Sequence, residues 1–149
     1  MGSQQRRSGL QQQKAVRLKA IGNFVTIRFG CERTFCEQVT RADLLTLPGI
    51  GDETADRTLL YACSRIVWPV DTYCLRVLAD IQVIPCVPTK AADKRRVAAA
   101  IKEMVAEEIP HELDNWQRLH AIMQLEGVEL RTRAKKSPIQ ENCPPGGSQ

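Results

Sequence analysis

The feature that most constrains this chain is the sequence Pro-Gly-Ile-Gly at positions 48–51, which separates two segments whose apolar residues recur at helical spacing. Proline cannot donate a backbone hydrogen bond, and glycine adopts positive φ at little cost, so this sequence ends one helix and forms a tight hairpin. Thr40, followed three residues later by an aspartate, is typical of a helix N-cap. We therefore expect one helix from the residue after Thr40 to Leu47, and a second from Asp52 to about Cys63.

Helical spacing also characterises the rest of the chain. Aromatic residues make up only 5% of it, alanine and leucine are abundant, and no segment alternates apolar and polar residues as a half-buried strand would. The fold class that this pattern predicts is all-α. Further helices are expected over residues 14–29, 71–79, 89–109 and 116–126. The expected organisation is a disordered lead-in over residues 1–12, one helical domain over 13–127, and a basic, then Pro/Gly-rich tail over 128–149.

The bulk composition is that of a globular protein of 149 residues, with 43% hydrophobic and 26% charged residues. The net charge of +4 is compatible with a polyanionic partner, although many proteins of this charge bind no nucleic acid. No apolar run reaches the roughly 20 residues of a membrane-spanning helix, and residues 1–7 lack the apolar centre of a secretion signal. We expect an intracellular protein, cytoplasmic in a prokaryote or nuclear in a eukaryote, with no membrane partner.

The hairpin is a candidate phosphate-binding site. The first N–H groups of a helix have no intrahelical acceptor, and those of Gly49, Gly51 and the residues after them can point together at one phosphate. A side chain at a glycine position would hold the phosphate away, and such a contact binds a phosphate backbone without reading sequence. A plain turn between two helices explains the same residues equally well. The residues assigned to the phosphate site are Leu47, Pro48, Gly49, Ile50, Gly51 and Thr54.

Asp71 is a candidate catalytic carboxylate. It follows an extended segment set by Pro69 and precedes a helical pattern, so it is also expected to be the N-cap of that helix. The two roles are compatible, because a carboxylate that caps a helix is rigid. Capping is the ordinary role of an aspartate here, so the case for catalysis depends on the hairpin that precedes it.

The hairpin and Asp71 together resemble a signature of the endonuclease III-like (HhH-GPD) superfamily of DNA glycosylases. The sequence Leu-Pro-Gly-Ile-Gly-Asp-Glu-Thr-Ala-Asp at residues 47–56 is followed, twenty residues after Gly51, by Val-Asp-Thr-Tyr at residues 70–73. In this superfamily Val-Asp-Thr opens the helix that presents the catalytic aspartate. The resemblance extends more weakly over residues 13–127. It implies a base-excision repair enzyme in which Asp71 is the catalytic residue.

Glu53 occupies the position at which strand-cleaving members of the superfamily carry a lysine, whose amine forms a Schiff base with the sugar. A glutamate has no such amine, and residues 49–56 are similar to the branch of the bacterial 3-methyladenine DNA glycosylases. The resemblance therefore implies a monofunctional enzyme that releases a damaged, alkylated base and leaves an abasic site. The alternative role of Glu53 is that of an exposed carboxylate in the first helical turn, where it favours the helix dipole.

Other members of the superfamily hold an iron–sulfur cluster with four cysteines near the C-terminal end. Cys143 stands at one of the matching positions, but Gln140 stands at another, and no cysteine lies between Cys86 and Cys143. One thiolate cannot hold the cluster. We therefore predict no cluster, no other cofactor and no metal site.

The resemblance also implies a partner and a mechanism. The partner is double-stranded DNA, bound by a monomer, and the target nucleotide is rotated into a pocket between helices. Asp71 then stabilises the positive charge that grows on the sugar as the N-glycosidic bond breaks. Tyr73 and Trp68 flank Asp71 and are candidate base-stacking residues, although core packing is the stronger expectation for Trp68.

Two other functions stay open. Residues 1–12 contain no counterpart of the helices that precede this region in the superfamily, where they supply part of the base pocket and a polar wedge. The chain is then a non-catalytic helix–hairpin–helix DNA-binding module or a truncated, inactive member of the superfamily. Alternatively, it is an interaction protein that uses the hairpin only as a turn. Base release and salt-sensitive DNA affinity distinguish these functions.

Overall fold

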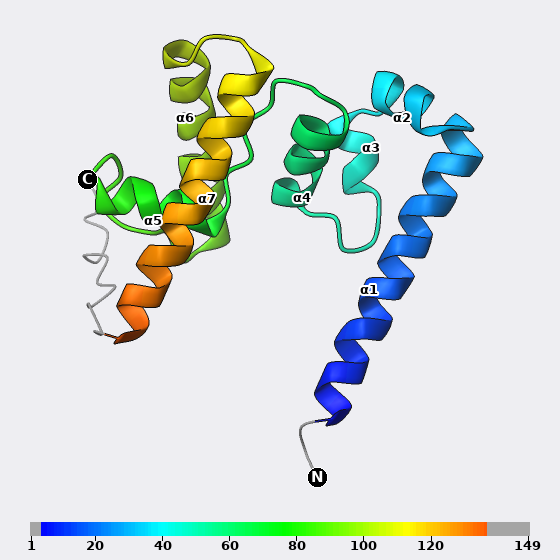
Figure 1. Ribbon diagram of the computed structural model, residues 1–149, viewed down its shortest axis with the longest axis horizontal. Coiled ribbons are helices and arrows are strands. Elements are labelled where there is room, and N and C mark those ends of the chain that lie inside the picture. The colour runs from blue at the N-terminus through cyan, green and yellow to red at the C-terminus, as the bar shows by residue number, and fades with distance from the viewer. Residues whose placement is uncertain (1–3, 137–149) are drawn as a thin grey trace. The chain divides into compact units, whose positions relative to one another are not determined.

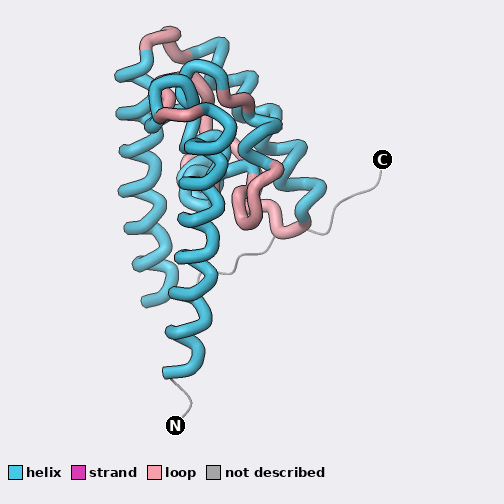
Figure 2. The backbone as a smooth tube through the Cα atoms, turned by 90° about the vertical axis from the view of Figure 1, so that its right-hand side faces the viewer, coloured by secondary structure: helices cyan, strands magenta, loops and turns pink. Residues whose placement is uncertain are grey.

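The computed structural model describes residues 4–136, and within that range the chain is helical, with no strand (Figure 2). The predicted all-α fold class is confirmed. The chain divides into two compact units, Met1–Arg65 and Ile66–Gln149, each described by itself below. Every helix in the described range is too short or too polar to cross a membrane.

The first unit begins with a long helix, α1 (Gln4–Phe24), which continues into a π-helical turn, η1 (Val25–Phe29) (Figure 1). Gly30, at φ 76°, ends this helical run as the sequence predicted. The predicted lead-in over residues 1–12 overlaps α1, which begins at Gln4. Glutamine and arginine, both good helix formers, make up six of the nine residues from 4 to 12.

A helix that the sequence analysis missed, α2 (Glu32–Gln38), follows at once. It is held by a cluster of three aromatic rings, in which Phe24–Phe29 and Phe29–Phe35 centroids lie 5.4 and 5.5 Å apart in edge-to-face geometry. Phe35 is buried. Arg65 closes the other end of α2, since its guanidinium donates hydrogen bonds to the carbonyl oxygens of Val39 and Cys36 at 2.5 and 2.7 Å.

The predicted pair of short helices is confirmed as α3 (Arg41–Leu45) and α4 (Asp52–Arg57), the latter continued by the π-helical turn η2 (Thr58–Ala62). The N-cap of α3 is a capping box. The Asp43 N–H donates to Thr40 Oγ1 at 3.1 Å, and the Thr40 N–H donates to Asp43 Oδ2 at 2.9 Å. The start of α3 is therefore fixed by two reciprocal hydrogen bonds.

The second unit consists of α5 (Thr72–Asp80), α6 (Ala91–Glu108) and α7 (Leu113–Lys136), and α7 packs along α5 (Figure 1). The predicted tail over residues 128–149 begins inside α7, which continues to Lys136. Glu129 and Arg133 form an ion pair of 2.5 Å one turn apart and support this extension of α7.

The centre of the second unit lies around Trp68, which is 1% exposed. Its ring contacts those of Trp116 and His120 in edge-to-face geometry, with centroids 6.2 and 5.7 Å apart. The prediction that Trp68 stacks on a base is therefore wrong, because the indole is enclosed by the protein. The expectation of core packing is confirmed.

Candidate active site

The hairpin between α3 and α4 depends on its two glycines in different ways. Gly49 has φ 78°, a conformation that favours glycine, whereas Gly51 is extended at φ −102° and ψ −178° and is the N-cap of α4. The Ile50 N–H donates to the Leu47 carbonyl at 3.1 Å and closes the turn, so it is not available to a phosphate. Within the described part of the chain, the N–H groups of Gly49 and Gly51 donate to no acceptor.

The hairpin lies at the surface of its unit. Pro48, Gly49, Gly51 and Thr54 are exposed, while Leu47 and Ile50 are half-buried. The side chain of Arg17, from α1, lies over Gly49, because a Cβ atom built there would be 2.2 Å from Arg17 Nε. The first unit therefore presents two free amides and one guanidinium at the same turn.

An ion-pair network that sequence reasoning missed holds the two hairpin helices together. Arg41 Nε donates to Asp56 Oδ1 at 2.7 Å, and Arg41 Nη2 donates to Asp52 Oδ1 at 2.5 Å. Asp56 is 1% exposed, and its hydrogen bond is the largest cause of the raised pKa of Arg41. Removing one member of such a pair leaves a buried charge without its partner, so the network fixes the turn between α3 and α4.

Glu53, the residue expected to set the subclass, is half-buried in the first turn of α4. Its Oε1 lies 3.0 Å from Arg57 Nη2, one helical turn further along. This carboxylate therefore has a local partner, and the position carries no amine that could form a Schiff base.

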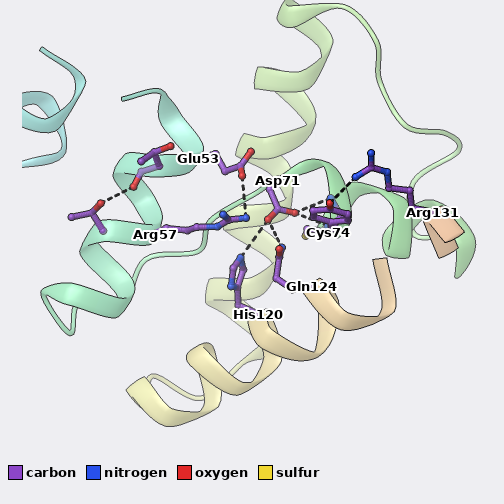
Figure 3. Close-up of polar contacts among 10 residues, drawn as sticks. Glu53, Arg57, Asp71, Cys74, His120, Gln124 and Arg131 are labelled. Atoms are coloured by element: carbon purple, nitrogen blue, oxygen red, sulfur yellow. Dashed lines mark hydrogen bonds and ion pairs between the residues drawn. The ribbon is translucent and has the colours of Figure 1, made fainter. Parts of the chain in front are cut away.

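Asp71 is the N-cap of α5, as predicted. Its Oδ1 accepts hydrogen bonds from the N–H groups of Tyr73 and Cys74, both at 2.8 Å (Figure 3). Its Oδ2 accepts a hydrogen bond from the side-chain amide of Gln124 and lies 3.8 Å from His120 Nε2. Both carboxylate oxygens are thus held by groups of the second unit, in one orientation at the positive end of α5.

His120 and Gln124 are functional candidates that sequence reasoning missed. They stand four residues apart on α7, so they lie on the same side of the helix and both face Asp71 (Figure 3). Their spacing is visible in the sequence, but the sequence does not show which segment this side of α7 meets. Only the packing of α7 against α5 brings them to the carboxylate.

Asp71 is 2% exposed. The side chain therefore faces inward, and both of its oxygens accept hydrogen bonds. The hairpin belongs to the first compact unit and Asp71 to the second.

Tyr73 is half-buried at the start of α5, beside Asp71. Arg131 Nη1 donates a hydrogen bond to Tyr73 Oη at 3.1 Å, and the guanidinium carbon of Arg76 lies 5.7 Å from the centre of the Tyr73 ring. Two cations therefore surround the one candidate stacking residue that is not enclosed in the core.

The positions used to exclude an iron–sulfur cluster lie outside the described residues. These positions are Gln140 and Cys143. Within residues 4–136, no group of three or more His, Cys, Asp or Glu side chains is placed to hold a metal ion. The absence of a cluster stays a prediction from the sequence.

The fold and this order of motifs define a class of protein. A helix–hairpin–helix, followed along the chain by an aspartate that caps the next helix, is the arrangement expected of the endonuclease III-like DNA glycosylases. Comparison with known proteins confirms the relationship, and the chain is a homologue of DNA glycosylases with the HhH-GPD fold.

Two such proteins are similar to this chain. The "Putative DNA repair glycosylase MJ1434" of Methanocaldococcus jannaschii is 30% identical over 145 residues, which cover 93% of this chain and 60% of that protein. The crystal structure of the H. pylori 3-methyladenine DNA glycosylase (MagIII), bound to 1,N6-ethenoadenine, matches with a TM-score of 0.56 and 27% identity over 89% of this chain. The match covers 60% of that structure, so the chain spans about 60% of the length of both proteins. No family model matches the chain.

Proposed function

We propose that this chain is a monofunctional DNA glycosylase of base-excision repair, which hydrolyses the N-glycosidic bond of an alkylated purine in double-stranded DNA. The observation that carries the proposal is Asp71, a carboxylate held at the N-terminus of α5 by two backbone amides in a homologue of DNA glycosylases. The name of the H. pylori protein, and the modified adenine bound to it, support the substrate class.

DNA binding is assigned to the hairpin of the first unit. In this proposal the N–H groups of Gly49 and Gly51 donate to one phosphate, supported by the positive end of the helical run from Asp52 to Ala62. Arg17 adds a guanidinium over the same turn. These contacts hold the backbone and leave the choice of lesion to the base pocket.

The chemistry is assigned to Asp71. As the bond between sugar and base breaks, positive charge develops on the sugar, and a carboxylate fixed nearby stabilises that charge. A purine alkylated at N3 or N7 leaves readily because its base is already cationic. The two amides on Oδ1 stabilise the carboxylate in its charged form.

The burial of Asp71 adds a condition to this mechanism. Oδ2, held by Gln124 and near His120, is the oxygen that would face the sugar, since Oδ1 is needed to cap α5. The hydrogen bond from Gln124 must therefore give way when the nucleotide enters. Groups near an active site commonly rearrange in this way when substrate binds.

Glu53 makes the proposed enzyme monofunctional. Because a carboxylate cannot form an imine with the abasic sugar, sodium borohydride added during the reaction should trap no covalent protein–DNA complex. A trapped complex would contradict this part of the proposal. We also propose that the enzyme acts as a monomer, in the cellular compartment that contains the DNA.

The test is a screen of duplexes that each contain one modified base, including 3-methyladenine and 1,N6-ethenoadenine, for abasic sites revealed by alkaline cleavage. Cleavage of at least one duplex by the wild-type chain, and not by Asp71→Asn, supports the proposal. Cleavage that Asp71→Asn retains would remove the catalytic assignment.

A second candidate function is a non-catalytic helix–hairpin–helix DNA-binding module. The burial of Asp71, which is 2% exposed, favours this function, since a side chain with both oxygens occupied serves well as a structural cap. Salt-sensitive binding to duplex DNA without abasic sites on any lesion would establish this function instead.

A further inference from the structure

We infer that Arg131 and Arg76, placed around Tyr73, form a second phosphate-binding site, which holds the DNA backbone beside the nucleotide presented to Asp71. The inference rests on the proposed function, because it assigns to DNA a surface of the second unit that lies outside the hairpin. The ligand is a phosphodiester, the one anionic group that DNA repeats at every nucleotide.

The first observation is the pairing of the surface arginines of α6 and α7. Arg96, Arg118 and Arg133 each lie within 3.4 Å of a carboxylate oxygen one turn away on the same helix. Arg131, Arg76 and, on α6, Arg95 have no carboxylate partner in the part of the chain that the structure describes, and of these three Arg131 and Arg76 converge on one ring. Their charges are therefore not compensated locally, although Arg131 stands only two residues from Arg133.

The second observation is the position of these two charges. They come from different helices, α7 and α5, and converge on one phenol ring, with Arg131 Nη1 3.1 Å from Tyr73 Oη and Arg76 5.7 Å from the ring centre. The side chain of Arg131 is exposed, and the hydrogen bond to Tyr73 uses one of its five N–H groups. The remaining N–H groups match the two oxygens of a phosphate, and the Tyr73 hydroxyl still has its own hydrogen to donate.

The third observation links this surface to Asp71. The Tyr73 N–H donates to Asp71 Oδ1 at 2.8 Å, so the residue that joins the two arginines is bonded to the carboxylate (Figure 3). Gly127 of α7 lies against the Tyr73 backbone and keeps this part of α5 in place. A phosphate bound by Arg131 and Arg76 is therefore held at a fixed position relative to Asp71.

The experiment measures the affinity of the full chain for a fluorescein-labelled duplex that carries a tetrahydrofuran abasic-site analogue, by anisotropy, between 50 and 200 mM KCl. Each phosphate contact contributes about 0.9 to the slope of log affinity against log salt concentration. Arg131→Gln should lower this slope by about 0.9 and weaken binding severalfold at low salt. Arg131→Lys should keep most of the slope and most of the affinity, because lysine keeps the positive charge.

The matched control is Arg133→Gln, which removes one positive charge from the same helix but from a residue already paired with Glu129. It should leave the slope unchanged. An Arg131→Gln slope equal to that of the wild type, or an equal loss in Arg133→Gln, would overturn the inference.

The outcomes for the two proposals are distinguishable. If the wild type binds duplex DNA and only Arg131→Gln lowers the slope, the second site stands, whether or not the lesion screen detects base release. If the lesion screen detects base release and Arg131→Gln leaves the salt slope unchanged, the second phosphate site is contradicted and the proposed enzyme activity is supported. If the wild-type chain has no salt-sensitive affinity for duplex DNA, both the second phosphate site and the proposed function are contradicted.

Discussion

Gly127 of α7 lies directly against the backbone of Tyr73 at the start of α5. A Cβ atom at Gly127 would be 2.6 Å from Tyr73 Cβ and 2.7 Å from the Tyr73 carbonyl oxygen, which is closer than such atoms approach one another. This close approach lets α7 pass α5 near enough for Gln124, one turn earlier, to reach Asp71. Glycine in the interior of a helix lowers the stability of that helix, but at position 127 it allows α7 to pack closely against α5.

Gly127→Ala should therefore destabilise the protein, because the obstacle is the backbone of another helix, which cannot move aside as a flexible side chain can. Overpacking of this kind costs roughly 1–3 kcal/mol. The control is Gly22→Ala in α1, where a Cβ would meet nothing within 4 Å and the better helix former should stabilise by up to about 1 kcal/mol. Urea unfolding of both variants measures the difference, and equal effects would contradict the packing role of Gly127.

The two hairpin glycines should respond differently to alanine. Gly51→Ala should leave the free energy of unfolding nearly unchanged, because Gly51 is extended and a Cβ there would meet nothing within 4 Å. It should nevertheless weaken DNA binding, since the new methyl group would occupy the space of the proposed phosphate. Gly49→Ala should lower both the free energy of unfolding and the affinity for DNA, because an alanine at φ 78° is strained by about 1–2 kcal/mol. DNA affinity that survives Gly51→Ala would argue against the hairpin as a phosphate site.

Asp71→Asn should retain the fold and lose base release by roughly 10²–10³-fold. Asparagine caps helices as well as aspartate does, whereas the loss of one fixed charge from a transition state costs about 3–4 kcal/mol. Single-turnover kinetics on the duplex identified by the lesion screen measures the rate. The matched variant Asp114→Asn, which alters an exposed acid paired with Arg118 on α7, should keep the wild-type rate.

The thiols should differ in reactivity. Cys31 is exposed, and the hydrogen bond of its side chain with Thr34 is the largest cause of its lowered pKa, while burial raises the pKa of Cys74 to about 11. Because the thiolate is the reactive form, a brief pulse of iodoacetamide at pH 8 should modify Cys31 well before Cys74. Peptide mass spectrometry follows both sites, and urea should abolish the difference. Equal labelling of both thiols in the native protein is the contrary result.

The capping box of α3 should give the protein a measurable pH dependence. The hydrogen bonds from Thr40, the side-chain bond first and the backbone bond second, lower the pKa of Asp43. The stabilisation is therefore fully present above the pKa of the unfolded state, about 3.9, and is lost as the pH falls through the lower folded-state value. The difference in unfolding free energy between wild type and Asp43→Asn should shrink below about pH 4. A difference that stays constant from pH 7 to pH 3 would contradict this account.

Local signals in the sequence were sufficient to predict the helical fold class, the hairpin, and the N-caps of α3 and α5. Thr40, Gly49 and Asp71 act through hydrogen bonds or backbone angles that involve residues only two or three positions away, so their roles follow from sequence spacing alone. Helix ends were harder to predict. The start of α1 at Gln4 and the end of α7 at Lys136 depend on residues with good helix propensity and no strong stop signal.

The tertiary structure alone decided what surrounds Asp71. Gln124 is 53 residues away in the chain, and nothing in its own neighbourhood indicates that it meets a carboxylate. The same holds for Arg41 with Asp56 and for Arg131 with Tyr73. Helix periodicity determines which residues share a side of a helix, but the partner of that side is set by how the helices pack, which depends on the shape and burial of many side chains at once. The sequence by itself therefore determined the class of protein and its central aspartate, and the packing of α5 on α7 determined that this aspartate is buried and which side chains hold it.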